Sequence, residues 1–364
     1  MRILFIAPRF HTNMVEWIRT LQVNNHEIFM STLLSHDTED HSLIRPIKFK
    51  LSIFSKIINF IFGDGGQNLK RGFPEIIIFI KYFKKLNPEI IIIRDLSRWF
   101  SILALFLSKF MNTKIVVYSQ NKIYNKFNFR RKLLHNIVCI LFNPAFISPI
   151  KGMESEGLNK LKNIYYVPFI AKKYNLKKND KKYFRILTIG KFTKRKNLIE
   201  LIEIIEELIN EGKNVKLDIV SEVFTPEHFE NLNKALVKYD FSEKDSRLRI
   251  YINIPHKNIN NFYNKTDLFI LPATAEPASI SVIEALANDI PVICSSTCGT
   301  CEYIIPGKSG LIFKDRDFFE MKRQIKLIMK QDYVYNDKKN FLNKDEYFYN
   351  FFSKMIKNQF DIQI

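Results

Sequence analysis

Two lysines flank a short loop that could bind phosphate groups. Lys191 follows Gly190 directly, and Lys196 lies five residues further along the chain. The apolar residues 185–189 before the loop predict a buried strand, and residues 198–210 after it predict a helix. Because the first N–H groups of a helix are unpaired and the helix dipole is positive at that end, such a loop suits a phosphate or diphosphate. The alternative is a basic loop that is only solvated.

Two glutamates could face the same edge of a sheet. Glu276 follows the predicted strand 268–271, and Glu284 lies in the first turns of the predicted helix 281–287. Since ligands of parallel α/β folds bind beyond the carboxyl ends of the strands, we expect both carboxylates at that edge. The alternative is a Glu276 that caps the helix and a Glu284 that is solvated.

Three cysteines follow with the spacing C-x₃-C-x₂-C, at Cys294, Cys298 and Cys301. Thiolates can ligate an iron–sulfur cluster. The run follows the helix of Glu284 directly, however, in a stretch where small residues are expected. We therefore interpret these residues as buried or partly buried free thiols.

The remaining sequence alternates apolar runs with helical patterns. Strands are predicted at 3–7, 27–30, 90–93, 115–118 and 146–147, and again at 185–189, 216–220, 249–252, 268–271 and 291–294. Helices are predicted between them, including 14–21, 99–110, 198–210, 226–239, 259–264 and 281–287. Strands that alternate with helices predict an α/β fold with parallel sheets.

The length of 364 residues predicts two domains. A polar, basic stretch at 172–182 interrupts the pattern, and we interpret it as a linker, with a long surface loop as the alternative. The predicted domains are thus 1–171 and 183–345, with a ligand-binding cleft between them. The segment 346–364 contains an aromatic helix that either completes the second domain or packs on the first.

The motifs of the second half resemble those of the retaining GT-B glycosyltransferases of family 4. That family shows a G-[RK]-L loop with a lysine five residues on, then E-x₇-E, E-A-x-A-x-G-x-P-V-I and G-x-x-E-x-I-x-x-G-x-x-G-L-x-F. The matching residues, in the same order, are Gly190-Lys191-Phe192 with Lys196, Glu276 to Glu284, Glu284-Ala285-Leu286-Ala287, Pro291-Val292-Ile293, and Gly299 to Phe313 with Glu302, Gly307 and Gly310.

The resemblance implies two Rossmann-like domains facing a central cleft, and a hexosyltransferase-type, retaining transfer of sugar from a nucleotide-diphosphate donor. It implies that Lys191 and Lys196 hold the diphosphate, that Glu276 contacts the transferred sugar and that Glu284 contacts the ribose. We expect the catalytic residues to be Glu276, Lys196 and Lys191. The implied donor-binding residues are Gly190, Lys191, Lys196, Ser279, Ile280 and Glu284. Glu222 and Ile254 are added beside the base from the placement of the strand ends 220–222 and 253–254 in such a fold, and not from matched residues.

The chemistry of such a transfer agrees with this assignment. A departing nucleoside diphosphate gains negative charge, which fixed cations and helix N–H groups stabilise. Two lysines can do this without a metal, so we predict metal-independent chemistry without a cofactor. A UDP-sugar or GDP-sugar is the expected donor.

The first half resembles the family less closely. Residues 87–95 resemble a strand that usually reads P-D-V-V-x-x-H, and 166–168 resemble the V-P-N-G that closes the first domain. The usual glycine-rich loop is replaced by Pro8–Asn13, Ser119-Gln120-Asn121 stands where a histidine often follows, and Asp289 replaces a glycine. Candidate acceptor-side residues are Arg9, His11, Gln120 and Asn121, although His11 could be a surface histidine and Gln120 structural.

The charge is unevenly distributed along the chain. The 56 Lys+Arg and 37 Asp+Glu residues give +19, and 46% of residues are apolar, which excludes a disordered chain. Residues 1–180 hold 28 basic and 12 acidic residues, a net charge of +16, whereas the remainder holds 28 and 25, a net charge of +3. This distribution favours an anionic acceptor or membrane as partner for the first half. No nucleic-acid motif is present, so we predict no nucleic-acid partner.

Two segments of the first half, 48–62 and 129–142, combine basic and large apolar residues at helical spacing. Helices of this kind can lie in a membrane interface with their bases on anionic headgroups, or pack on the sheet with the basic face in water. No apolar run is long enough to span a bilayer, and the apolar start, 3–7, is too short for a signal peptide. We predict a cytoplasmic protein that can rest on the inner face of the membrane.

Two functional hypotheses follow. The first is a glycosyltransferase acting on a saccharide or lipid-linked acceptor, in cell-surface polysaccharide or lipopolysaccharide biosynthesis. The second is a catalytically silent GT-B protein that binds a membrane or polyanion. The presence of both glutamates, Glu276 and Glu284, with both lysines, Lys191 and Lys196, favours the enzyme.

Overall fold

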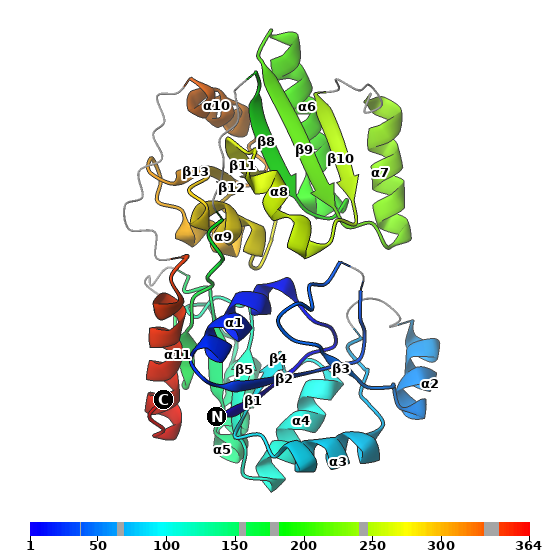
Figure 1. Ribbon diagram of the computed structural model, residues 1–364, viewed down its shortest axis with the longest axis vertical. Helices are drawn as coiled ribbons and strands as arrows, with labels where there is room; N and C mark the ends of the chain where they lie inside the picture. Colours follow the sequence, from blue (N-terminus) through cyan, green and yellow to red (C-terminus); the bar gives the residue numbers. More distant parts are fainter. Residues whose placement is uncertain (37, 64–68, 153–157, 175–181, 240–246, 331–341) are drawn as a thin grey trace. The chain divides into compact units, whose positions relative to one another are not determined.

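The computed structural model describes residues 1–36, 38–63, 69–152, 158–174, 182–239, 247–330 and 342–364. The chain forms two compact units, coloured by sequence in Figure 1. Unit 1 comprises Met1–Phe169 and Asp345–Ile364, and unit 2 comprises Ile170–Lys344. The predicted linker, 172–182, falls largely within 175–181, outside the described residues.

Unit 1 is built on a parallel sheet. In spatial order, its described strands are β3 (Ile47–Lys48), β2 (Glu27–Thr32), β1 (Arg2–Ile6), β4 (Ile90–Arg94), β5 (Lys114–Tyr118), β6 (Ala145–Ser148) and β7 (Ile164–Tyr166). The central strands β1 and β4 are continuous apolar runs because helices cover both faces of such a sheet. The order reverses between β1 and β4, the place where doubly wound folds bind ligands.

The described part of unit 1 has five helices among these strands: α1 (Val15–Val23), α2 (Ile53–Phe62), α3 (Ile76–Leu86), α4 (Trp99–Phe110) and α5 (Phe129–Phe142). The prediction of one helix over 48–62 is wrong at its start. Ile47 and Lys48 pair with β2 as an edge strand, and Ser52 caps the helix by accepting a hydrogen bond from the Ser55 N–H, 3.1 Å away.

The last helix, α11 (Asp345–Phe360), belongs to unit 1 and packs on α1. The buried Trp17 ring stacks on Phe348 with centroids 5.4 Å apart, and its indole N–H donates to the Pro168 carbonyl at 2.9 Å. Arg19 forms two hydrogen bonds with the Asp345 carboxylate. Of the two predicted placements of this helix, packing on the first domain is therefore confirmed.

Unit 2 has a second parallel sheet. Its described strands, in spatial order, are β10 (Leu248–Ile252), β9 (Val215–Ser221), β8 (Phe184–Ile189), β11 (Leu268–Leu271), β12 (Val292–Ser295) and β13 (Gly310–Phe313). The helices are α6 (Leu198–Asn210), α7 (Pro226–Lys238), α8 (Asn260–Tyr263), α9 (Ile280–Ala287) and α10 (Phe318–Met329). Here the strand order reverses between β8 and β11. The predicted α/β class, with two Rossmann-like sheets, is confirmed.

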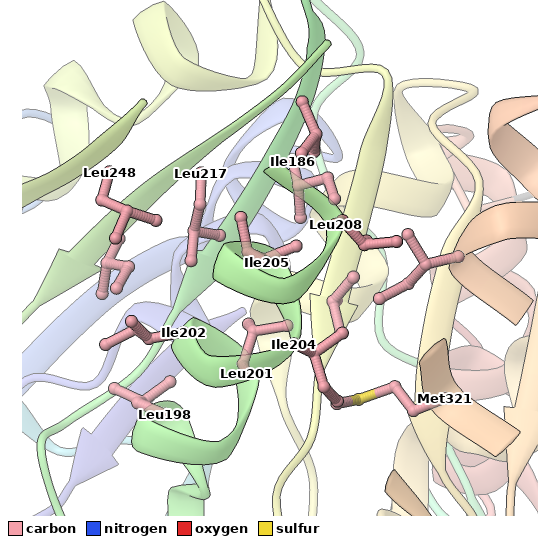
Figure 2. Close-up of a cluster of buried hydrophobic side chains, with 14 of the residues drawn as sticks. Ile186, Leu198, Leu201, Ile202, Ile204, Ile205, Leu208, Leu217, Leu248 and Met321 are labelled. Carbon is pink, nitrogen blue, oxygen red and sulfur yellow. The ribbon is translucent and has the colours of Figure 1, made fainter. Parts of the chain in front are cut away.

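The core of unit 2 forms along one stripe of α6. Figure 2 shows Leu198, Leu201, Ile202, Ile205 and Leu208 of this helix directed at the sheet and its neighbours. These residues recur every three or four positions, the spacing that puts side chains on one face of a helix. The stripe therefore holds α6 in place, and with it the loop between β8 and α6.

One departure from the family pattern has a backbone explanation. Asp289 stands where the family has glycine, and its φ of 56° lies in the left-handed region. Aspartate tolerates this region better than most residues do. The Lys173 ammonium pairs with the Asp289 carboxylate at 2.5 Å, so the turn before β12 is kept without a glycine.

Candidate functional site

The strongest candidate site lies where the strand order of unit 2 reverses. The loop after β8 and the loop after β11 bring together the buried Lys196 and Glu276, whose Nζ and Oε2 atoms are 2.8 Å apart. The Arg195 guanidinium also pairs with Glu276. Two cations and one carboxylate thus meet at the carboxyl ends of neighbouring strands.

Three backbone and side-chain features position Lys196. The next residue, Asn197, adopts a φ of 49°, and its side-chain Nδ2 donates to the Pro272 carbonyl at 2.7 Å. The Thr274 N–H donates to the Arg195 carbonyl at 2.8 Å, which joins the two loops. A Cβ atom on Gly190 would lie 3.4 Å from Cδ of Lys196, an ordinary van der Waals contact, so the lysine stem packs directly against this glycine.

The Glu276 carboxylate is ionised at neutral pH. Burial raises its pKa, but the charges and hydrogen bonds of Lys196 and Arg195 lower it more, and the net pKa lies below the ordinary value. The Glu276 carbonyl accepts a hydrogen bond from the Gly299 N–H at 2.8 Å. This contact ties the glutamate loop to the segment that follows β12.

Glu284 is also buried, and both of its oxygens have partners. Nε2 of His256 lies 2.6 Å from Oε1, and the Tyr263 hydroxyl donates to Oε2 at 2.8 Å. Burial raises the pKa of Glu284, but His256 and Tyr263 lower it by more. The net pKa lies below the ordinary value, so the carboxylate stays charged. Since each carboxylate oxygen can accept two hydrogen bonds, Glu284 keeps capacity for a ligand hydroxyl.

The second predicted lysine lies on the other side of β8. The Lys191 ammonium is 3.1 Å from Oε2 of Glu222, at the end of β9. Asn253 joins this region to the end of β10, because its Oδ1 accepts from the Val223 N–H at 2.8 Å. The half-buried Ile254 follows. The loop after β8 therefore directs Lys191 toward β9 and Lys196 toward β11.

The start of α9 carries the other predicted donor contacts. Ser279 precedes the helix, and its N–H donates to the Thr300 hydroxyl at 3.4 Å. Its hydroxyl lies 2.8 Å from that of Ser281. The N–H of Ser279 thus has a hydrogen-bond partner within the protein, the Thr300 hydroxyl. Ile280 is the first residue of α9 and is half-buried.

Three residues of the site, Arg195, His256 and Tyr263, were not predicted from the sequence. Arg195 could have been found from its place beside Lys196. His256 and Tyr263 have no local signal, because they follow β10 and reach Glu284 from 28 and 21 positions away. Their pairing with Glu284 depends on how α8 and the turn His256–Asn258 before it pack against α9.

Asp315 and Asp317 form an Asp-x-Asp run that could suggest a metal site. Asp315 accepts hydrogen bonds from the hydroxyls of Thr274 at 2.9 Å and Thr297 at 3.1 Å, and Asp317 caps α10. The two carboxylates therefore serve the protein's own structure. Within the described ranges, no group of three or more His, Cys, Asp or Glu residues is placed to hold a metal ion.

The cysteine run lies beside this site. Cys294 and Cys298 are buried, Cys301 is half-buried, and all are free thiols. The Cys298 sulfur lies 3.1 Å from the Thr300 hydroxyl, and a hydrogen bond from Cys294 lowers the Cys298 pKa to about 7. None of the three forms a disulfide, and their burial agrees with the expectation of buried or partly buried thiols.

In unit 1, a polar cluster lies where the strand order reverses. The buried Tyr118 hydroxyl accepts from Asn13 at 2.8 Å and from Gln120 at 3.2 Å, and the Arg94 guanidinium donates to Gln120 Oε1 at 3.3 Å. Nε and Nη1 of Arg94 are buried and make no hydrogen bond within the described residues. Arg94 was not predicted as a site residue, although it ends the strand in which the family often has histidine.

The other predicted acceptor-side residues are spread over this edge. Arg9 and His11 are half-buried in the loop after β1. Burial raises the pKa of the nearby Glu39, and the charge of Arg9 offsets part of this effect. Asn121 is exposed after β5, where its carbonyl accepts from the Ser148 hydroxyl at 2.5 Å. Of the four predicted residues, Gln120 is the one that the described contacts place in the polar cluster.

Two units in one chain, each with a Rossmann-like parallel sheet, are the architecture of the GT-B class. Residues 170–345 match the family model of the glycosyl transferases group 1, which agrees with the motif resemblance. This part of the chain belongs to that family, and the predicted family and GT-B fold are confirmed.

Known relatives and structures agree with this membership. The chain is 24% identical over 163 residues to the capsular polysaccharide biosynthesis glycosyltransferase CapM of Staphylococcus aureus; the match covers 45% of this chain and 40% of that protein. It thus spans less than half of that relative. An uncharacterized protein in the cps region of Klebsiella pneumoniae is 23% identical over 282 residues. This match covers 71% of this chain and 74% of that protein. Anabaena HepE, solved in complex with UDP-glucose, has the same fold, with a TM-score of 0.69, 11% identity and full coverage of both chains.

Proposed function

We propose that this protein is a retaining, metal-independent glycosyltransferase that moves a sugar from a nucleotide-diphosphate donor to a saccharide or lipid-linked acceptor. The observation that carries the proposal is the buried cluster of Lys196, Arg195 and Glu276 at the point where the strand order of unit 2 reverses. Doubly wound folds bind nucleotides at such points.

Each part of the site has a role in this proposal. Lys191, Lys196 and Arg195 stabilise the charge that develops on the departing diphosphate. Glu276 contacts the transferred sugar, and Glu284 accepts a hydrogen bond from the ribose. The ends of β9 and β10, near Glu222 and Ile254, lie beside the base.

The proposed pathway is the assembly of cell-surface polysaccharide or lipopolysaccharide. Relatives support this, since one is a capsular polysaccharide biosynthesis glycosyltransferase and another lies in a cps region. A solved neighbour with 12% identity and a TM-score of 0.61 is the lipopolysaccharide outer core galactosyltransferase WaaB.

We further propose that unit 1 rests on the inner face of an anionic membrane. Among the described residues, 20 of the 27 exposed large apolar side chains lie in unit 1, mostly on α2, α3, α4 and α5. Rings connect these helices: Phe54 of α2 stacks near Trp99 of α4 at 6.2 Å, and Phe106 of α4 meets Phe142 of α5 at 5.3 Å. Exposed apolar surface of this extent is typical of proteins that bind membranes or partners. No described helix is long and apolar enough to cross a bilayer.

A catalytically silent protein that uses unit 1 to bind membranes is the second candidate. The same exposed apolar helices favour it. The two candidates differ in nucleotide binding: the enzyme must bind a nucleotide near Lys196 and Glu284, whereas the silent protein need not.

A thermal-shift screen with UDP and GDP tests the proposal. We expect one of the nucleotides to raise the melting temperature of the wild-type protein, and Lys196→Ala and Glu284→Gln to weaken this shift. The surface variant Glu207→Gln, which changes an exposed pair with Lys322, serves as the control. Absence of any shift in the wild type would refute the enzyme, whereas normal shifts in both site variants would refute the site assignment.

A further inference from the structure

Unit 1 contains a cavity of about 700 Å³ between α5 and the sheet. Val117 of β5 and Phe146 of β6 line one side, and Leu134 and Val138 of α5 line the other. Small-molecule sites have volumes of about 300–1,000 Å³, so the cavity is large enough for a ligand. None of the proposed donor-site residues lines it.

The helix α5 leaves this space open. Among its residues Cys139 alone is buried, although a helix on a sheet normally buries a whole stripe. His135 holds the helix at this distance: its ring lies 4.4 Å from that of Phe146, and its Nε2 donates to the Lys162 carbonyl at 2.7 Å. The cavity therefore results from the way His135 attaches α5 to the sheet.

The walls of the cavity fit hydrocarbon. Ile123 and Phe127 add to the apolar lining already named, and both are buried. A free nucleotide or sugar would leave its polar groups without partners against such walls. An alkyl or prenyl chain would remove apolar surface from water on both sides.

The rim of the cavity is cationic. Lys122, Arg130 and Arg131 line it and are exposed, and the Arg131 guanidinium lies 5.0 Å from the centre of the Phe127 ring. Guanidinium groups bind phosphate through paired hydrogen bonds. Apolar walls beneath a cationic rim match an amphiphile with a phosphate group.

The polar end of the cavity indicates where the head group of such an amphiphile would lie. Asp95, Ser119 and Asn121 line it at the carboxyl ends of β4 and β5, the edge at which α/β folds place their ligands. A chain held under α5 would present its head group at this edge. We propose that the cavity binds the hydrocarbon chain of a lipid-phosphate acceptor of the prenyl phosphate type. This inference rests on the proposed function, whose acceptor class it specifies.

Calorimetric titration with farnesyl phosphate tests the inference, with inorganic phosphate and farnesol as reference ligands. We expect farnesyl phosphate to bind the wild type more tightly than either reference. Val138→Trp fills the cavity and should weaken binding at least tenfold, while the adjacent Ile137→Trp, outside the lining, should not. Arg130→Gln with Arg131→Gln should weaken farnesyl phosphate binding but leave farnesol unchanged.

A second pair guards against a folding defect in the tryptophan variants. Leu134 lines the cavity, whereas its exposed neighbour Leu133 does not, and glutamine at either position is tolerated in an exposed helix. Leu134→Gln should weaken binding and Leu133→Gln should not. Equal effects within either pair, or a folded wild type that binds no farnesyl phosphate, would overturn the inference.

Two further measurements separate the possible causes of failure. If UDP or GDP stabilises the protein but farnesyl phosphate does not bind, the cavity inference fails and the glycosyltransferase stands. If Val138→Trp lowers binding to phosphatidylglycerol vesicles as strongly as it lowers farnesyl phosphate binding, the cavity holds bulk membrane lipid and the acceptor assignment is wrong.

Discussion

At the scale of single residues, the donor site separates into two carboxylates with different neighbours. Glu276 faces two cations and Glu284 faces a histidine and a tyrosine. Both are buried, yet both have pKa values below the ordinary value of 4.5, because these partners outweigh the cost of burial. The two residues should therefore respond differently to substitution.

Glu276→Gln should lower the rate of sugar transfer by about 10²–10³-fold, the typical loss for one electrostatic contact to a transition state. UDP or GDP binding should change little, because Glu276 is assigned to the sugar and not to the nucleotide. Donor turnover and the thermal shift measure the two effects separately. An equal loss of both would place Glu276 in the nucleotide site instead.

The pairing of Glu284 predicts a pH dependence of stability. A carboxylate whose folded pKa is lowered stabilises the fold fully above the ordinary value of 4.5, and this contribution is lost as the pH falls through the folded pKa. The difference in melting temperature between wild type and Glu284→Gln should thus be largest near neutral pH and shrink on acidification. A difference that stays constant with pH would show that the charge of Glu284 contributes nothing.

At the scale of elements, the attachment of α11 to α1 decides the stability of unit 1. Phe348 is fully buried against the Trp17 ring, so Phe348→Ala should cost about 3–5 kcal/mol of unfolding free energy. Chemical denaturation followed by Trp fluorescence measures this loss. Phe319→Ala, at an exposed position of α10, should be nearly neutral. A neutral Phe348→Ala would mean that α11 adds little to the fold.

At the scale of the whole molecule, charge and apolar surface coincide in residues 1–180. This part carries a net charge of +16, and its most exposed apolar side chains include Phe60 at 91%, Phe110 at 84% and Ile140 at 81%. Anionic lipid attracts each Lys or Arg near its surface by about 1 kcal/mol, and salt screens this attraction. Membrane binding should therefore combine a salt-sensitive and a salt-insensitive part.

Sedimentation with phosphatidylglycerol vesicles tests this expectation. The wild type should bind at low salt and partly dissociate at high salt. Changing Phe60, Phe110 and Ile140 to serine should reduce binding at both salt concentrations. The matched changes Phe229→Ser and Phe319→Ser in unit 2 should have no effect. Wild-type protein that remains in the supernatant at low salt would refute the membrane proposal.

Much of the fold could be predicted because its central strands carry strong local signals. Residues 90–93 are four isoleucines in a row, and the stripe of α6 repeats every three or four residues. The edge strands β3 and β7 were missed, since their residues are exposed or half-buried and lack a continuous apolar pattern. The start of α2 after Ser52 was also missed, because the cap is formed by a single hydroxyl.

The sequence by itself determined the alternation of strands and helices, the family motifs and the presence of Lys196, Glu276 and Glu284. These follow from burial periodicity and from short spacings along the chain. Tertiary structure alone decided that Glu276 meets Arg195, that His256 and Tyr263 hold Glu284, and that α5 leaves a cavity. Such contacts depend on how distant loops and helices pack, because each joins residues whose separation along the chain carries no periodic signal.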